Sequence, residues 1–220
     1  MPRHDDAAAA AVVADLPALL AEHRRVLLGI VGPPGAGKTT LARSVVDLVD
    51  DAYSVGTGAL VPMDGFHLSN QVLDDLGRSD RKGAPDTFDA DGFVSLIERI
   101  TSDDDRPVYC PGFDHSMGEP VAARLVVGRA ARVVVVEGNY LALDDDPWRG
   151  LPHLLHRIYF IDTPTDLRRS RLIERHIAAG KSRGEAQAWV DVVDEPNARL
   201  IGATRHRCDV VIDDAHPPIE

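Results

Sequence analysis

The sequence predicts an α/β fold in which helices cover both faces of a parallel β-sheet, in a single domain over residues 1–220. Three observations favour this fold. Short apolar runs alternate with longer segments of helical periodicity along the chain, as in right-handed β–α–β units. A glycine-rich motif at residues 32–39 joins one such run to a helical segment. Residues 132–136 contain four consecutive valines, which is typical of a strand in the middle of a parallel sheet.

The composition of the chain limits the classes of function that it can have. The chain has 220 residues, of which 44% are hydrophobic, enough for one sizeable core. The net charge of −11 and the pI near 5.2 argue against nucleic acid or a membrane as the main partner. Cys110 and Cys208 are too few for a disulfide framework, which favours a reducing, cytoplasmic location. No apolar run approaches the length of a membrane span, and the histidines show no metal-ligand spacing.

The segment Gly32-Pro33-Pro34-Gly35-Ala36-Gly37-Lys38-Thr39 fits the phosphate-binding pattern G-x-x-x-x-G-K-[ST]. A strand at 26–31 precedes it and a helix at 40–49 follows, which is the context that the motif requires. A glycine-rich turn that ends a strand by chance is the alternative. Glycines let successive N–H groups face one anion, and the helix N-terminus adds partial positive charge. We expect Lys38 to reach the β- and γ-phosphates and the Thr39 hydroxyl to ligate Mg²⁺. The residues expected to bind ATP in this segment are Gly32, Gly35, Ala36, Gly37, Lys38, Thr39 and Thr40.

The first half of the chain contains three further elements. Residues 1–23 carry a leading helix over 5–23 that is interrupted or restarts at Pro17. Residues 59–64 form a second strand, and 70–86 form a helix fragment and a long loop of the kind that is usually functional. Residues 89–100 form a helix with its apolar residues on one face, and 103–105 form a solvated turn.

The second half continues the alternation. Residues 106–127 contain a strand-like segment at 123–127, and the valine strand at 132–136 ends in Glu137. Further strands are expected at 157–162 and 210–212. A helix opens at Pro164 and Thr165 and ends at Gly180. A short basic loop at 181–184 precedes a helix over 185–205 that breaks near Pro196.

Two carboxylates follow directly after predicted strands, where ligands gather in open α/β sheets. Asp64 is placed to accept the proton of a hydroxyl group that attacks the γ-phosphate. Glu137 suits a Mg²⁺ site, through water. For each residue the alternative is a helix cap or a turn.

Polar side chains elsewhere suggest the rest of a site. Arg168, Arg171 and Arg175 share one helix face, and guanidinium groups suit the charge of a transferring phosphoryl group; Arg183 in the next loop is placed to join them. The alternative is a solvated face paired with acidic residues. His67, Tyr109 and His115 are candidates for binding the acceptor, although a packed or surface role is equally compatible with each alone.

These motifs together resemble the uridine kinase, phosphoribulokinase and bacterial pantothenate kinase family. The resemblance covers about residues 24–213. Its strand-end pairs, Asp-Gly-Phe and Glu-Gly, are more specific than its phosphate loop. The matching segments besides that loop are Met63-Asp64-Gly65-Phe66-His67, Pro107-Val108-Tyr109, Glu137-Gly138, and Asp162-Thr163 followed by Arg168-x-x-Arg171.

The resemblance implies a P-loop NTPase fold of three α/β/α layers, with a five-stranded parallel sheet and a helical lid at about residues 165–190. It implies Asp64 as the catalytic base, Lys38 and Thr39 as phosphate and Mg²⁺ residues, and Glu137 as a metal-site carboxylate. It also implies that Arg171 and Arg175 bind phosphate from the side of the lid, and that Arg171 is one of the catalytic residues.

Two positions set this chain apart within the family. Gly65 is closer to the pantothenate kinase pattern, since uridine kinases usually have serine there. The 109–115 segment is only loosely similar to the nucleoside-binding stretch of uridine kinases, and Pro111-Gly112 departs from it. Residues 62–86 and this segment are closer to a bacterial branch labelled nucleoside/nucleotide kinase-like or fructose-transport-system kinase, which leaves the acceptor open.

The function expected from the sequence is an ATP- and Mg²⁺-dependent kinase of a small hydroxyl-bearing metabolite. Pantothenate-like or sugar-like alcohols come first as acceptors, then nucleosides, then a phosphorylated sugar. A homodimer is left open, and neither nucleic acid nor a membrane is expected as a partner. The alternatives are a P-loop NTPase acting as a nucleotide-sensing regulator or accessory subunit, and a degenerate nucleotide-binding scaffold.

Overall fold

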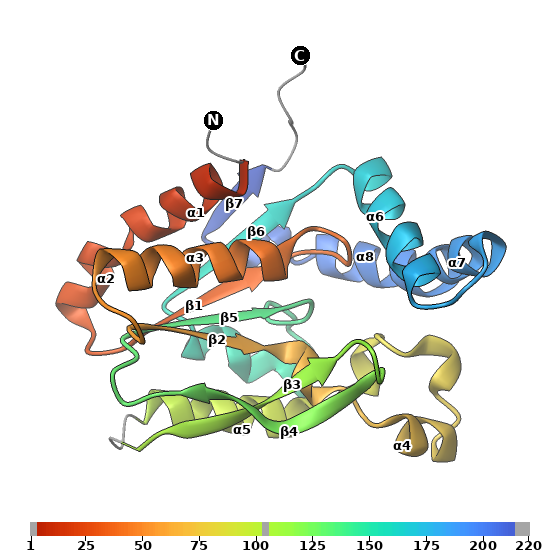
Figure 1. The fold of residues 1–220 in the computed structure, drawn as a ribbon, viewed down its shortest axis with the longest axis horizontal. Coiled ribbons are helices and arrows are strands. Elements are labelled where there is room, and N and C mark those ends of the chain that lie inside the picture. The colour runs from red at the N-terminus through yellow and green to blue at the C-terminus, as the bar shows by residue number, and fades with distance from the viewer. Residues whose placement is uncertain (1–3, 103–105, 214–220) are drawn as a thin grey trace.

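A five-stranded sheet forms the centre of the molecule (Figure 1). The computed structural model describes residues 4–102 and 106–213, so the turn predicted at 103–105 lies outside the described residues. The strand order is β2-β5-β1-β6-β7, and every neighbouring pair is parallel. The predicted parallel α/β sheet is therefore confirmed, with the valine strand β5 between two others. The strands are β1 (Val26–Val31), β2 (Gly58–Pro62), β5 (Val133–Gly138), β6 (Arg157–Asp162) and β7 (Val210–Asp213).

Helices cover both faces of this sheet because side chains along each strand alternate between the faces. On β1, Leu28 and Ile30 pack with α1 (His4–Ala14), α2 (Leu16–Glu22) and α3 (Lys38–Ala52). Leu27 and Val31 point to the other face and pack with α5 (Ala90–Thr101) and the segment 140–155. The result is the expected three-layer α/β/α architecture.

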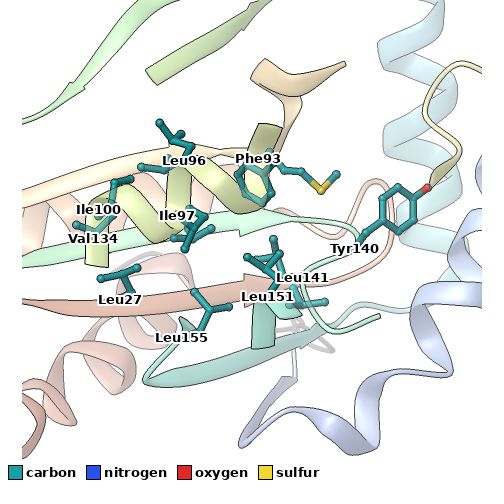
Figure 2. Close-up of a cluster of buried hydrophobic side chains, with 14 of the residues drawn as sticks. Leu27, Phe93, Leu96, Ile97, Ile100, Val134, Tyr140, Leu141, Leu151 and Leu155 are labelled. Carbon is teal, nitrogen blue, oxygen red and sulfur yellow. The ribbon is translucent and has the colours of Figure 1, made fainter. Parts of the chain in front are cut away.

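The core under α5 illustrates the packing (Figure 2). Asp89 caps this helix, since its carboxylate accepts a hydrogen bond from Gly92 N at 2.9 Å. The face predicted from the sequence is buried, with Phe93 and Ile97 fully inaccessible to solvent. Burying each such side chain contributes about 1.5–3 kcal/mol to stability, so this face fixes α5 against the sheet.

An antiparallel hairpin, β3 (Val108–Asp114) and β4 (Glu119–Val127), forms a second small sheet. Only its second strand was expected in part. Asp114 shapes the connecting turn, since its Oδ1 accepts hydrogen bonds from Ser116 N at 2.9 Å and Met117 N at 3.2 Å. The register shifts between Cys110 and Gly112, which changes the side chains that face the rest of the molecule.

Two boundaries differ from the sequence prediction. Strand β2 ends at Pro62, and the residues from Met63 to Phe66 form a 3₁₀ turn instead of extending the strand to Asp64. The helix expected over 185–205 is interrupted just before Pro196, as predicted, but it ends earlier, at Gly202, and Pro196 lies in the first turn of α8 (Glu195–Gly202). A π-helical turn at Val190–Asp194 precedes it. The wider turn accommodates the proline, which has no N–H to donate and would clash with the carbonyl four residues earlier.

The predicted lid region consists of α6 (Thr165–Ala178) and α7 (Arg183–Trp189), which pack against each other. Helix α7 begins at Arg183 rather than after a loop reaching 184. Ser182 and Glu185 form a capping box that starts it, with Glu185 N donating to Ser182 Oγ at 3.3 Å. None of the helices among the described residues is long and apolar enough to cross a membrane.

Candidate active site

The phosphate-binding motif forms a tight loop between β1 and α3. Gly35 has a φ of +78°, and a Cβ at this position would lie 2.8 Å from the backbone oxygen of Arg168. Only glycine fits such a conformation and such a close approach. Lys38 is buried, and its Nζ donates to the Pro33 carbonyl at 3.1 Å, so the ammonium lies over the loop. Thr40 lies one residue farther along α3 and is exposed.

Glu137 lies beside the loop because its backbone is paired with Ile30 on one side and Pro62 on the other. Its Oε1 accepts a hydrogen bond from Thr39 Oγ1 at 2.9 Å, and the residue is 4% exposed. Burial raises the pKa of Glu137 to about 7, with Asp64 adding to the rise and Lys38 opposing it. Burial also lowers the pKa of Lys38 to about 8, because desolvation disfavours the charged form.

The oxygen atoms of Thr39 and Glu137 fit a hard divalent cation such as Mg²⁺. Within the described part of the chain, no group of three or more His, Cys, Asp or Glu side chains is arranged to hold a metal ion. A cation here therefore needs water and phosphate oxygens as well, which is how Mg²⁺ is usually held.

Asp64 lies in the 3₁₀ turn after β2, with its side chain 42% exposed. Besides burial, which has the larger effect, the negative charge of Asp64 raises the pKa of both Lys38 and Glu137. The ends of β2 and β5 touch, since a Cβ on Gly138 would lie 2.6 Å from the Cβ of Met63. This contact brings the Asp64 carboxylate near the phosphate loop, and the carboxylate stays partly exposed to solvent.

The arginines of α6 face the phosphate loop. Arg168 is 5% exposed, donates to the Pro34 carbonyl at 3.3 Å and pairs with Glu195 at 3.5 Å. Arg171 donates to the Gly35 carbonyl at 3.4 Å, and Arg175 is close enough to lower the pKa of Lys38. Arg168 thus binds the loop itself, whereas Arg171 is exposed beside it. Arg183, also exposed, starts α7.

The acceptor-side candidates separate into two groups. His67 packs against Phe88, with ring centroids 4.0 Å apart, and Phe113, at 5.0 Å. The ring of His115 lies against the same Phe113, with the centroids 5.3 Å apart. Burial lowers the pKa of His67, and His115 adds to this decrease. Tyr109 is 62% exposed and alternates with buried neighbours on β3, so its ring points away from the packed side of the hairpin. Tyr109 therefore has the surface position that the sequence analysis gave as the alternative for this residue.

The β3–β4 hairpin contacts the turn that carries Asp64 at Gly65. A Cβ on Gly65 would lie 2.6 Å from the carbonyl carbon of Pro111, and its carbonyl oxygen is closer still. A side chain at residue 65 would therefore push the hairpin away. The two positions that depart from the uridine kinase pattern, Gly65 and Pro111-Gly112, are in direct contact.

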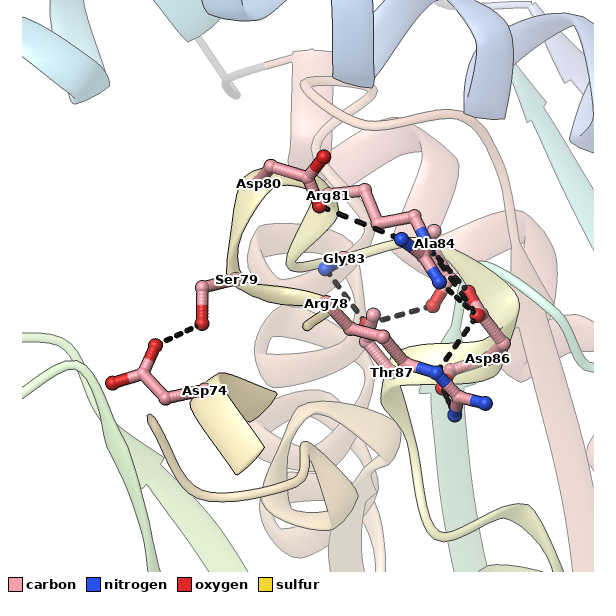
Figure 3. Close-up of polar contacts among 9 residues, drawn as sticks. All are labelled: Asp74, Arg78, Ser79, Asp80, Arg81, Gly83, Ala84, Asp86 and Thr87. Carbon is pink, nitrogen blue, oxygen red and sulfur yellow. Dashed lines mark hydrogen bonds and ion pairs between the residues drawn. The ribbon is translucent and has the colours of Figure 1, made fainter. Parts of the chain in front are cut away.

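Polar contacts hold together the loop between α4 (Asn70–Asp75) and α5 (Figure 3). Gly83 N donates to Thr87 Oγ1 at 2.9 Å, and Arg78 and Arg81 both pair with Asp86, at 3.3 and 3.0 Å. Lys82 joins the loop to the hairpin, since its Nζ donates to Gly118 O at 2.7 Å.

Two residues that the sequence analysis did not identify hold this loop. The hydroxyl of Tyr140 donates to the Gly83 carbonyl at 2.5 Å, and Asn197 Nδ2 donates to the same oxygen at 3.3 Å. Tyr140 is fully buried and follows the end of β5, while Asn197 comes from α8. Burial raises the pKa of the Tyr140 hydroxyl, with Asp64 contributing, so the phenol stays a donor.

Comparison with known proteins agrees with this geometry. The model of the phosphoribulokinase/uridine kinase family matches residues 27–216. The "Putative uridine kinase C227.14" of Schizosaccharomyces pombe is 34% identical over 174 residues, which cover 77% of this chain and 74% of that protein. The "Uncharacterized protein YggC" of Escherichia coli is 33% identical over 190 residues, covering 86% and 78%. The crystal structure of a "putative fructose transport system kinase" from Silicibacter sp. TM1040 has a TM-score of 0.81 and 32% identity, covering 96% of this chain and 100% of that one.

Proposed function

This chain belongs to the phosphoribulokinase/uridine kinase family of P-loop kinases, and from that premise we propose that it transfers the γ-phosphate of ATP to a hydroxyl group of a small metabolite. The observation that carries the proposal is the convergence of Lys38, Thr39, Asp64 and Glu137 at the carboxyl ends of three adjacent strands. A phosphate-binding group, a cation site and an accessible carboxylate are the parts that phosphoryl transfer to an alcohol needs.

Each side chain has a distinct part in this reaction. Lys38 exchanges its bond to the Pro33 carbonyl for bonds to phosphate oxygens, and the loop N–H groups cradle the same anion. Thr39 and Glu137 would hold Mg²⁺, which when bound neutralises charge on the phosphates. Asp64 accepts the proton of the attacking hydroxyl group. Arg171 and Arg175 stabilise the negative charge of the transferring phosphoryl group from the side of α6.

The acceptor is best described as a sugar-like or pantothenate-like alcohol, with nucleosides ranked lower. This ranking is supported by Gly65, because the hairpin approaches its backbone too closely for the serine that is usual in uridine kinases. Lys82, His67 and Phe113 surround the acceptor side with polar and aromatic groups. A nucleotide-sensing accessory role is less favoured, because Asp64 is exposed toward these groups rather than enclosed by the phosphate loop.

The test is a screen of alcohols for ATP consumption, with mass analysis of the phosphorylated product. With an acceptor in hand, Asp64→Asn is expected to lower kcat by about two to four orders of magnitude, because general base catalysis is lost. The ATP dissociation constant should change little, since Lys38 and the loop remain. Asp91→Asn, on the exposed side of α5, is the matched control and should keep full activity. Near-normal kcat in Asp64→Asn would refute the assignment of the base.

A further inference from the structure

Glu195, the first residue of α8, is an acidic residue enclosed beside two arginines of α6. Its side chain is 14% exposed, and its Oε1 lies 3.5 Å from Arg168 Nη1 and 3.9 Å from Arg169 Nη1. This oxygen is one of two buried side-chain polar atoms, among the described residues, that make no hydrogen bond. Burying a carboxylate is costly unless an opposite charge compensates it. The two arginines supply that compensation.

A neighbouring ion pair between the same elements lies in a different environment. Asp191, in the π-helical turn before α8, accepts a hydrogen bond from Arg169 at 2.6 Å, and its side chain is 58% exposed. The Arg168 side chain, which faces Glu195, is 6% exposed. Charges interact more strongly where water is excluded. The pair between Glu195 and Arg168 is therefore the one with the larger influence on its surroundings.

Arg168 contacts the phosphate loop at two successive residues. Its guanidinium group donates to the Pro34 carbonyl at 3.3 Å, and its backbone oxygen would lie 2.8 Å from a Cβ on Gly35. The loop binds an anion by turning N–H groups toward it, so a loop carbonyl that faced the anion would repel it. Because Arg168 holds the Pro34 carbonyl toward α6, it supports the loop conformation that binds phosphate.

The contact between Arg168 and the loop depends on a negative charge. Nη1, which donates to the Pro34 carbonyl, is also the atom that faces Glu195. The other acceptor of this guanidinium group is the Thr165 hydroxyl, at 3.4 Å, and both hydrogen-bond acceptors are neutral. Without the carboxylate, the buried guanidinium group would lose the charge that compensates it and would move toward water or another anion.

We propose that Glu195 is a positioning residue for ATP binding, which keeps Arg168 on the Pro34 carbonyl and so holds the phosphate loop in its binding conformation. This inference rests on the proposed kinase function and adds a residue that acts through Arg168. Its charge and its positioning role have opposite effects on affinity. By Coulomb attraction alone, loss of a negative charge near the triphosphate site would tighten ATP binding. Loss of the position of Arg168 would weaken it.

The first test uses the ligand-free chain. Glu195→Gln keeps the size of the side chain and removes its charge. Hydrogen exchange of the Ala36 amide, which donates to the Pro33 carbonyl at 3.1 Å, should become faster because the loop is released. Asp191→Asn, which removes the exposed partner of Arg169, is the matched control and should leave this exchange rate unchanged. Equal exchange in Glu195→Gln and the wild type would overturn the inference.

The second test measures the dissociation constant of the β,γ-imido analogue of ATP, with Mg²⁺, by calorimetry at a temperature where melting curves show every variant folded. Glu195→Gln should bind about tenfold more weakly, the scale of one hydrogen bond from a charged group, and Asp191→Asn should bind like the wild type. Arg168→Met should weaken binding at least as much. Adding Glu195→Gln to Arg168→Met should cause no further loss, because no guanidinium group is left to position. Loss of both members of a buried ion pair is often tolerated, so this double variant should fold.

The outcomes separate the two proposals. Unchanged or tighter binding in Glu195→Gln would overturn the role of Glu195 while leaving the kinase function in place. Additive losses in the double variant would overturn it as well, because Glu195 would then act independently of Arg168. Failure of the wild-type chain to bind the analogue would refute the ATP-dependent function itself, on which the inference rests.

Discussion

The double anchor on the Gly83 carbonyl predicts a strong energetic coupling between two residues that are far apart in the sequence. Tyr140→Phe removes one donor without leaving a cavity, and Asn197 still pairs with the oxygen, so we expect a loss of about 0.5–1 kcal/mol. Asn197→Ala should cost about 1 kcal/mol for the same reason. In the double variant the carbonyl has neither donor, which adds the desolvation cost of an unpaired group, about 1–3 kcal/mol. The coupling energy should therefore be at least about 1 kcal/mol.

The assay is urea unfolding at equilibrium, followed by tryptophan fluorescence, to which Trp148 contributes from a buried position with its ring 5.5 Å from that of Tyr140. Tyr109→Phe is the matched control, because that hydroxyl lies on an exposed ring, and its effect should stay within about 0.5 kcal/mol. The double variant should also raise the KM for the acceptor more than either single change. Losses that add within about 0.5 kcal/mol would refute the shared anchor.

Three further predictions concern the site. Gly65→Ala should push the hairpin away from Pro111 and raise the KM for the acceptor while ATP affinity, measured by calorimetry, stays the same; an unchanged KM would contradict the steric argument. A non-hydrolysable ATP analogue should increase hydrogen-exchange protection over residues 176–189, whereas the start of α6, held by Arg168, should be protected in both states; equal protection throughout would count against a mobile lid. Burial raises the pKa of Glu137 from its ordinary value of 4.5 to about 7. This carboxyl group therefore contributes fully to the free energy of unfolding at a pH below 4.5, and it loses that contribution as the pH rises through about 7. Urea unfolding should show up to about 3 kcal/mol of this decline by pH 8 in the ligand-free chain and less in Glu137→Gln, and identical pH profiles would exclude Glu137 as its source.

The parts of the fold that depend on local patterns were predictable from the sequence. The valine strand, the helix with Phe93 and Ile97 on one face, and the loop around Lys38 each carry their signal within a few consecutive residues. Since parallel strands end at one edge of a sheet, the placement of Asp64 and Glu137 near the phosphate loop also followed from order alone.

The parts that depend on distant contacts were not predictable in this way. Tyr140 and Gly83 are 57 residues apart, and Asn197 and Gly83 are 114 apart, so no local pattern links them. The orientation of Tyr109 depends on the register shift in the hairpin, which has no periodic signature. The start of α7 does have a local signal in the sequence, the Ser182-x-x-Glu185 capping box.

The contact between Gly65 and Pro111 has a consequence for assigning substrates among related chains. A relative with a side chain at the position of Gly65 must hold its hairpin in another place, so its acceptor pocket has a different shape even where the phosphate loop and the strand-end acids agree. Gly65 and Pro111 therefore need to be compared as a pair. A substrate found for one member transfers to another only when both positions match, because sequence agreement at the ATP side says nothing about the alcohol.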